Sequence, residues 1–255
     1  MNSSKKYVAI TGAYGGLGEA MSKEYYNAGY GLVLLGRDMD KLMKLKKSIN
    51  DTEDIITLQT DVSNWDSCLS AYKKLKECNV NIDTLINNAG ITYIKKFDKD
   101  YEIDKYQQLI STNLNGPVFM SRVFIEDLIK NNGNIINISS VIGYAPVIGR
   151  TAYAASKFGM EGFSSVLSAE LKDKVHILMV YPTFIQTSIR KDIEGDKTIN
   201  EILTADYVAK KIIEAQKNKK TRLYLGKTAK LSYYLYKFLP KLYLRLMTKK
   251  THDVS

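Results

Sequence analysis

Thr11-Gly12-Ala13-Tyr14-Gly15-Gly16-Leu17-Gly18 is the stretch that decides the fold of this chain. The apolar run 7–11 before it has the composition of a buried strand, and residues 19–27 after it have the pattern of a helix. Glycine lets the backbone approach a ligand closely, and a helix start offers unpaired N–H groups and the positive end of the helix dipole. Loops also use glycine for conformation alone, so the prediction depends on the flanking strand and helix. Together they predict a diphosphate site that includes Gly12, Tyr14, Gly15, Gly16, Leu17 and Gly18.

Short apolar segments alternate with amphipathic ones through most of the chain. Helix-like stretches such as 39–50 and 65–78 lie between the apolar segments. This alternation is typical of βαβ units around a parallel sheet that is buried on both faces. We therefore expect an α/β fold with a Rossmann-like, doubly wound sheet in a single domain over residues 1–227. The seven predicted parallel strands are residues 7–11, 31–35, 55–60, 82–86, 133–138, 175–181 and 221–225.

The charge of the chain is concentrated near its end. Residues 217–250 hold 11 basic residues and no acidic one, which leaves 26 basic against 27 acidic residues for the rest of the chain. The net charge of +10 therefore does not describe the body of the protein. A basic face that binds nucleic acid is not expected there.

Cysteine and histidine positions argue against two other classes of protein. Cys68 and Cys78 share one charged stretch, and neither has a metal-ligand spacing to His176 or His252. We expect neither a disulfide framework nor a metal site, and a reducing, cytoplasmic setting. The short polar start leaves no room for a signal peptide, and no stretch has the roughly 18 consecutive apolar residues that a membrane-spanning helix needs.

The second predicted strand ends at Leu35-Gly36-Arg37-Asp38, which bears on the choice of nucleotide. About 20 residues beyond the glycine turn, an acidic residue would bind the ribose hydroxyls of NAD, whereas an arginine accommodates the 2′-phosphate of NADP. Arg37 lies 19 residues after Gly18 and therefore favours NADP(H), with NAD(H) as the alternative. The structural alternative is an exposed arginine at a helix start, with Asp38 as the N-cap.

Tyr153 and Lys157 are spaced so that they share one face of a helix. A cation beside a phenol favours the phenolate and moves the pKa of tyrosine from near 10 toward neutrality, which suits proton exchange with an alcohol or ketone. The same spacing arises by chance in many helices. Ser140, at the end of the predicted strand 133–138, adds a hydroxyl that can hydrogen-bond a substrate oxygen, although serines at strand ends often only satisfy the backbone.

With these residues the chain resembles the short-chain dehydrogenase/reductase family over roughly residues 5–225. The resemblance rests on motifs that occur in the family's order. They are T-G-x-x-x-G-x-G at 11–18, Asp61-Val62, Asn87-Asn88-Ala89-Gly90, Asn113, and Ser140 with Tyr153 and Lys157.

The resemblance implies a role for each matching residue. Tyr153 would be the general acid/base, Ser140 would polarise the carbonyl, and Lys157 would lower the tyrosine pKa and bind the nicotinamide ribose. Asn113 would hold a water molecule in a proton relay, although the residues alone are equally consistent with a structural residue that bends a helix. The residues Asn87 to Gly90 are likewise consistent with a simple strand-end turn. Beyond the glycine turn and Arg37, the implied cofactor contacts are Asp61, Val62, Asn88, Ala89, Gly90, Tyr153, Lys157, Pro182, Thr183, Ile185 and Thr187.

Substrate choice depends on the walls of the predicted pocket. Thr183 stands where the family usually has glycine and adds bulk there, and residues 188–203 would form a lid. The wall residues are mostly apolar or aromatic, which suits a hydrophobic carbonyl such as a steroid, fatty acyl or aryl ketone, although some of them could simply pack the core. They are Ile142, Tyr144, Pro146, Val147 and Arg150 on one side and Phe184 on the other.

Residues 228–255 form a basic C-terminal extension with Pro240 inside it. A basic amphipathic helix can lie on an anionic membrane surface, which would make this a peripheral membrane protein. The extension could instead pack on its own domain, cover the active-site mouth or contact a partner subunit. The long ending resembles that of monomeric or dimeric family members, and we expect a homodimer. The apolar residues at helical spacing are Leu231, Tyr234, Leu235, Phe238, Leu239, Leu242 and Leu246.

Two hypotheses of function follow. The first is an oxidoreductase that transfers a hydride between NADP(H) and a carbonyl or alcohol. The second is a catalytically weak protein on the same fold that senses the cofactor or regulates at a membrane, because a fold does not settle function. Such proteins typically lose the tyrosine or the lysine of the catalytic set, and this chain retains Tyr153 and Lys157.

Overall fold

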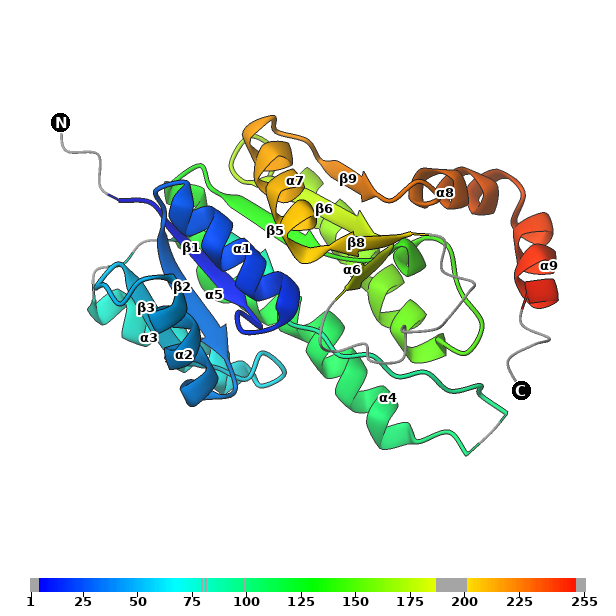
Figure 1. Cartoon of the computed structure of the whole chain (residues 1–255), viewed down its shortest axis with the longest axis horizontal. Helices are drawn as coiled ribbons and strands as arrows, with labels where there is room; N and C mark the ends of the chain where they lie inside the picture. Colours follow the sequence, from blue (N-terminus) through cyan, green and yellow to red (C-terminus); the bar gives the residue numbers. More distant parts are fainter. Residues whose placement is uncertain (1–4, 79, 81, 99, 187–200, 251–255) are drawn as a thin grey trace.

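The protein is built around one seven-stranded parallel sheet with helices on both faces (Figure 1). The computed structural model describes residues 5–78, 80, 82–98, 100–186 and 201–250. The strand order is β3-β2-β1-β4-β5-β6-β9, and every neighbouring pair is parallel. The predicted α/β class, the doubly wound sheet and its seven strands are therefore confirmed.

The strands and helices lie close to their predicted positions. The strands of the large sheet are β1 (Tyr7–Thr11), β2 (Gly31–Gly36), β3 (Ile55–Gln59), β4 (Ile82–Asn87), β5 (Asn134–Ile138), β6 (His176–Pro182) and β9 (Arg222–Leu225). The helices of the body are α1 (Gly16–Asn27), α2 (Met39–Ile49), α3 (Trp65–Glu77), α4 (Ile103–Ile110), α5 (Gly116–Lys130), α6 (Thr151–Glu170) and α7 (Ala205–Lys217).

The side chains of each strand alternate between two apolar layers, because successive residues of a strand point to opposite faces. Helices α1, α2 and α7 cover one face, where Ile10, Leu34 and Ile136 belong to the same buried cluster as Met21 and Ile212. Helices α3 and α5 cover the other face with the end of α6. The sheet is thus buried on both sides, which explains why its strands read as continuous apolar runs.

The order of the strands indicates at which end of the sheet a ligand would bind. The chain adds β2 and β3 on one side of β1 and then crosses to add β4, β5, β6 and β9 on the other side. Ligands of open α/β sheets bind at such a reversal, beyond the carboxyl ends of the strands. Thr11, at the end of β1, and Asn87, at the end of β4, lie at that point.

Three features depart from the predicted pattern. Helix α1 begins at Gly16, inside the glycine stretch, rather than at residue 19. A five-residue π-helix, Ser111–Asn115, joins α4 to α5. Within the predicted lid 188–203, only residues 201–203 are described, and there β8 (Ile202–Thr204) pairs in parallel with β7 (Phe184–Gln186).

The C-terminal extension folds as two helices, α8 (Ala229–Phe238) and α9 (Pro240–Lys250), which lie beyond the β9 edge of the sheet (Figure 1). Pro240 begins the second helix, since proline is well tolerated at a first helical position but not inside a helix. None of the helices in the described part of the chain is long and apolar enough to cross a membrane.

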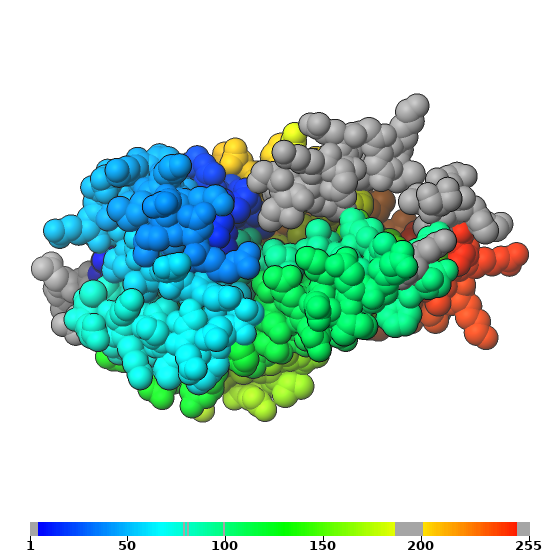
Figure 2. Space-filling model, turned by 90° about the horizontal axis from the view of Figure 1, so that it is seen from below, coloured from blue at the N-terminus to red at the C-terminus, as the bar shows by residue number. Residues whose placement is uncertain are grey.

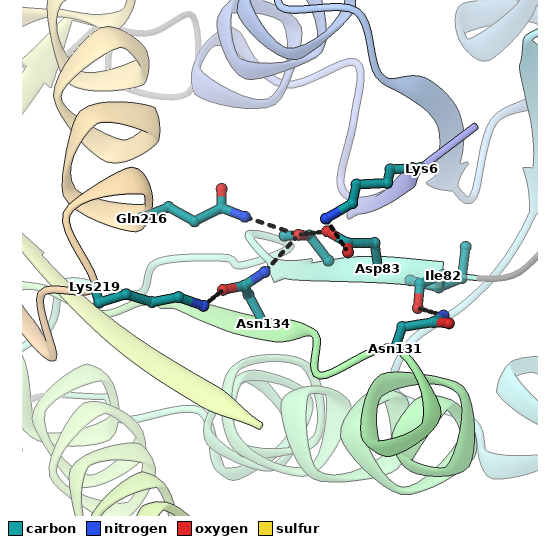
Figure 3. Close-up of polar contacts among 8 residues, drawn as sticks. Lys6, Ile82, Asp83, Asn131, Asn134, Gln216 and Lys219 are labelled. Atoms are coloured by element: carbon teal, nitrogen blue, oxygen red, sulfur yellow. Dashed lines mark hydrogen bonds and ion pairs between the residues drawn. The ribbon is translucent and has the colours of Figure 1, made fainter. Parts of the chain in front are cut away.

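A buried polar network ties the amino ends of β4 and β5 to α7 (Figure 3). Thr84 Oγ1 accepts hydrogen bonds from Gln216 Nε2 at 2.9 Å and Asn134 Nδ2 at 3.2 Å, and it donates to Asp83 Oδ2 at 3.1 Å. Lys6 Nζ lies 3.1 Å from the other oxygen of the buried Asp83 carboxylate, so this charge is paired. Buried polar groups require such partners, and one hydroxyl serves as the shared acceptor here.

We expect Thr84→Val to lower the free energy of unfolding by about 1–3 kcal/mol, because two buried amides would lose their acceptor. Thr57→Val on β3 is the matched control, since the Thr57 hydroxyl makes a weak hydrogen bond to the sulfur of Met43 at 3.4 Å and is no shared acceptor among the described residues. Denaturant titration of both variants measures the difference. Equal stability of the two would contradict the importance of the network.

Candidate functional site

The glycine turn has a shape that larger residues would not permit. Gly12 has φ of +62°, a conformation that glycine adopts readily, and an added Cβ would lie 2.9 Å from Ala89 Cα. A Cβ on Gly18 would collide with the carbonyl oxygen of Gly12. The first N–H groups of α1 have no acceptor within the helix, and Gly16, Leu17 and Gly18, which carry them, line a cavity, as a diphosphate site requires.

The end of β4 is joined to this turn by hydrogen bonds. Thr11 Oγ1 accepts from the backbone N–H groups of Asn88, at 2.9 Å, and Ala89, at 3.0 Å, and it donates to Ile86 O at 3.2 Å. Asn88 Nδ2 donates to the carbonyl oxygens of Thr11 and Gly12 at 2.9 and 3.1 Å. Asn88 therefore braces the glycine turn through its side chain, while its neighbours remain at the surface of the cavity.

A cavity of about 510 Å³ lies over the carboxyl ends of β1, β2 and β4. Its size, its mostly apolar lining and its open glycine turn fit the adenosine and diphosphate portion of a dinucleotide. The predicted residues that line it are Gly12, Tyr14, Gly15, Gly16, Leu17, Gly18, Arg37, Asp61, Val62, Asn88, Ala89 and Gly90.

Several other residues of the lining were not predicted. Gly36 directly follows the predicted second strand and Thr60 is the last residue of the predicted third strand, so their position at a strand end was an available signal. Gly36 is small by necessity, since an added Cβ would lie within 3.1 Å of the Tyr14 ring atom Cδ1. Ile91, Thr92 and Thr112 come from loop and helix segments whose approach to the turn no local pattern indicates.

Arg37 is the exposed residue that directly follows β2 at the edge of the cavity. Asp38 caps α2 by accepting a hydrogen bond from Lys41 N at 3.1 Å, which confirms the predicted N-cap. Lys41 Nζ lies 3.0 Å from Asp38 Oδ2 and 5.6 Å from the ring centroid of Tyr14. A second cation thus stands next to the glycine turn, contributed by the first turn of α2.

Lys157 is the buried cation of the site. Its ammonium lies 5.7 Å from the ring centroid of Tyr153, one helical turn earlier on α6, and donates to the carbonyl oxygen of Ile138 at 2.8 Å. Burial disfavours the charged form and lowers the pKa of Lys157 to about 8. At neutral pH most of the lysine is still protonated, so the phenol has a cation beside it.

Ser140 lies two residues after the end of β5 and caps the short 3₁₀ helix Val141–Gly143, with its Oγ accepting from Ile142 N at 3.2 Å. Its hydroxyl hydrogen remains available for donation to another oxygen. The 3₁₀ helix packs against α6, which carries Tyr153 and Lys157. The Lys157 hydrogen bond to Ile138, two residues before Ser140, ties the two segments together.

Asn113 lies in the π-helix and is fully buried. Its Oδ1 accepts from Ile91 N and its Nδ2 donates to Ile91 O, each at 2.8 Å. π-helical turns occur frequently at functional sites. The side chain braces the loop after β4, which leaves the second hydrogen of Nδ2 and the second lone pair of Oδ1 beyond these two hydrogen bonds.

Thr183 fits because Gly226 faces it. Gly226 has φ of +105°, and a Cβ added there would lie 3.0 Å from Thr183 Cβ and closer to the ends of its side chain. Thr183 N donates to Leu225 O at 3.0 Å, so the loop after β6 is held by the end of β9. Pro182 ends β6 and Ile185 lies in β7, whereas Thr187 lies outside the described residues.

The residues predicted to line the substrate pocket lie in different surroundings. The Tyr144 hydroxyl donates to Ala229 O at 2.7 Å, and its ring packs on Tyr181, Tyr224 and Tyr233, so this side chain holds the C-terminal extension. Arg150 Nη1 donates to Thr92 Oγ1 at 3.4 Å, which directs the arginine toward the cavity rim. Ile142 is buried, and Val147 and Phe184 are half-buried.

A parallel sheet with a glycine turn at its reversal point, and a serine, tyrosine and lysine on the next segments along, defines the class of dinucleotide-binding oxidoreductases. Residues 6–198 match the family model described as short chain dehydrogenase. The chain belongs to the short-chain dehydrogenase/reductase family.

Known proteins of this family align with most of the chain. It is 30% identical over 262 residues to dehydrogenase/reductase SDR family member 7B of Xenopus laevis, covering 95% of this chain and 81% of that protein. It is 32% identical over 184 residues to 3-ketodihydrosphingosine reductase of Bos taurus, covering 69% of this chain and 55% of that protein. The closed form of a serine dehydrogenase complexed with NADP⁺ superposes with a TM-score of 0.75 at 27% identity, over 82% of this chain and 88% of that one.

We expect Gly18→Ala to abolish measurable dinucleotide binding, because its methyl group would force the Gly12 carbonyl and the turn apart. Gly162→Ala in α6 is the matched control, since nothing lies within 4 Å of an added Cβ and alanine favours a helix interior by about 1 kcal/mol. Calorimetric titration with NADPH, together with a melting curve for each variant, tests this. Unchanged affinity in Gly18→Ala would show that the turn does not hold the diphosphate.

Proposed function

We propose that this protein is an NADP(H)-dependent oxidoreductase that interconverts a carbonyl and an alcohol on a hydrophobic substrate. The observation that carries the proposal is the buried Lys157 ammonium, 5.7 Å from the Tyr153 ring and anchored on the strand that leads to Ser140. A lysine buried with a single backbone acceptor is costly for folding, and its proximity to a phenol gives a chemical reason for keeping it.

Ser140, Tyr153 and Lys157 each have a separate role in the proposed carbonyl reduction. When bound, the nicotinamide ring supplies the hydride for reduction or accepts it for the reverse oxidation. The Ser140 hydroxyl donates a hydrogen bond to the substrate oxygen and so polarises the carbonyl. Tyr153 transfers its phenolic proton to that oxygen as the alcohol forms, and the Lys157 cation stabilises the phenolate left behind. Asn113 keeps the loop after β4 in position through its two bonds to Ile91.

Positive charge near the end of β2 supports NADP(H) over NAD(H) as the cofactor. Arg37 lies at the cavity rim, and Lys41 stands beside Tyr14 of the glycine turn. Cations at this place suit a 2′-phosphate, whereas a carboxylate would be needed to bind both ribose hydroxyls of NAD. Asp38, the carboxylate that follows Arg37 in the sequence, is already engaged in capping α2 and pairing with Lys41.

The proposed substrate is a lipid-like ketone or alcohol. Ile142 contacts Ser140, and Val147 and Phe184 are half-buried; these apolar residues of the predicted wall suit a steroid, fatty acyl or aryl ketone. One relative is named for its action on 3-ketodihydrosphingosine, and this supports the fatty acyl type. A catalytically weak cofactor-sensing protein is the alternative, and the activity measurement below separates the two.

We expect Tyr153→Phe to lower kcat for carbonyl reduction by about a hundredfold to ten-thousandfold, the usual contribution of a general acid. NADPH affinity should change little, because the ring is kept. Tyr207→Phe, at an exposed position on α7, is the control and should retain full activity. Turnover of hydrophobic ketones followed by NADPH absorbance measures this. Activity of Tyr153→Phe equal to that of the control would remove Tyr153 from the reaction.

We expect Arg37→Asp to reduce the ratio of kcat/KM for NADPH over NADH by about tenfold to a hundredfold, through loss of a charge-assisted contact to the 2′-phosphate. Lys73→Asp, an exposed charge reversal on α3, is the control. Initial rates with the two nucleotides and one ketone give the ratio. A ratio that does not differ from the control would leave the NADP preference without support.

A further inference from the structure

The C-terminal helices carry an apolar face that no other described residue covers. Leu231 and Phe238 of α8 are 66% and 65% exposed, and Tyr234 lies between them on the same face, stacked on Phe238. Their spacing of three and four residues puts all three on one side of the helix. We call this the outer tail face. Exposed leucines follow it along the chain: Leu239 lies between the two helices, and Leu242 and Leu246, four residues apart, share one side of α9.

The opposite side of α8 fastens the extension to the body. Ala229 is buried, and its carbonyl accepts from the Tyr144 hydroxyl. Tyr233 packs on Tyr144, and Tyr236 packs on Phe158 of α6. The outer tail face is therefore held in a set direction, at the end of the molecule away from α2 and α3 (Figure 1, Figure 2).

The charged residues of α8 and α9 are all basic. Lys230, Lys237, Lys241 and Arg245 are all exposed, and the sequence from 217 to 250 contains no acidic residue. Two copies of this face placed together would bring like charges into contact, which disfavours a tail-to-tail dimer. A surface that offers apolar depth and negative charge together is the matching partner.

We propose that the outer tail face docks on the surface of a lipid bilayer that contains anionic headgroups. The apolar side chains enter the boundary between headgroups and acyl chains, and the lysines and Arg245 contact the phosphates. Tyr234 suits this interfacial layer, because its ring is apolar and its hydroxyl is polar, and Phe238 adds a purely apolar ring.

Docking would bring the catalytic segments to the membrane. Tyr144, which binds Ala229, lies four residues after Ser140, and Phe158, which contacts Tyr236, directly follows Lys157. This consequence rests on the proposed function: an amphiphilic carbonyl substrate would enter the site from the bilayer. Membrane docking would then raise the rate on a lipid ketone without changing the chemistry.

Flotation of the full chain with vesicles tests the apolar part. We expect binding to vesicles of phosphatidylcholine with phosphatidylserine, and a loss of about tenfold or more in the double variant Leu231→Ser, Phe238→Ser. The control pair Ile129→Ser, Val166→Ser removes exposed apolar residues from α5 and α6 and should leave binding unchanged. Equal loss in both pairs, or no binding by the intact chain, would overturn the proposal.

The charged part is tested with Lys237→Gln and Lys241→Gln together. Binding should fall by about tenfold on vesicles with phosphatidylserine and change little on phosphatidylcholine alone. Lys73→Gln with Lys130→Gln, on α3 and α5, is the matched control. If the intact chain prefers neither lipid, the headgroup assignment is wrong.

Sizing chromatography and activity distinguish the other outcomes. A dimer that the Leu231→Ser, Phe238→Ser variant converts to a monomer, without vesicle binding, would make this face an interface between copies and refute the proposal. The same variant should keep its rate on a water-soluble ketone and lose rate only on a ketone carried in vesicles. Vesicle binding without any reductase activity would refute the proposed function and leave the docking surface supported.

Discussion

The hydrogen bonds around Thr11 are the interaction on which the nucleotide end of this protein depends. One hydroxyl accepts from two consecutive backbone N–H groups after β4, and Asn88 returns two bonds to the glycine turn after β1. Two strands that are distant in the sequence thereby end at a fixed separation. The cavity lies beside these hydrogen bonds. Its lining includes Gly12 and Gly18, which lie too close to neighbouring backbone atoms to carry a side chain.

The proposed catalytic residues depend on a second contact between segments, made by a charged side chain. The Lys157 ammonium is buried, and the backbone carbonyl of Ile138 accepts its hydrogen bond. This bond fixes α6 against β5, and so it fixes the distance between the segments that carry Tyr153 and Ser140. Burial weakens the hold of Lys157 on its proton but leaves the group largely charged at neutral pH. Lys157 thus both fixes α6 against β5 and supplies the positive charge near the Tyr153 ring.

The region after β6 shows how the chain accommodates a departure from its family. Threonine replaces the usual glycine at Thr183, and the space it needs is provided by Gly226, which lies after β9 and has positive φ. The next residues of the chain enter α8, where Tyr144 binds Ala229 through its hydroxyl. The loop near the active site and the base of the C-terminal extension are therefore packed against each other. We expect substitutions in the loop and in the extension to have non-additive effects on stability, because residues in contact couple.

Local patterns were enough to predict the seven strands, the glycine turn, the Asp38 cap and the shared helical face of Tyr153 and Lys157, because alternation and turn chemistry act over a few residues. Local patterns did not predict that Lys41 lies over Tyr14, that Gly226 makes room for Thr183, or that Tyr144 holds the extension. Each of these contacts joins segments that only the packed sheet brings together. Hydrophobic spacing specifies which face of an element is buried, but the partner of that face is chosen by the arrangement of all the other elements.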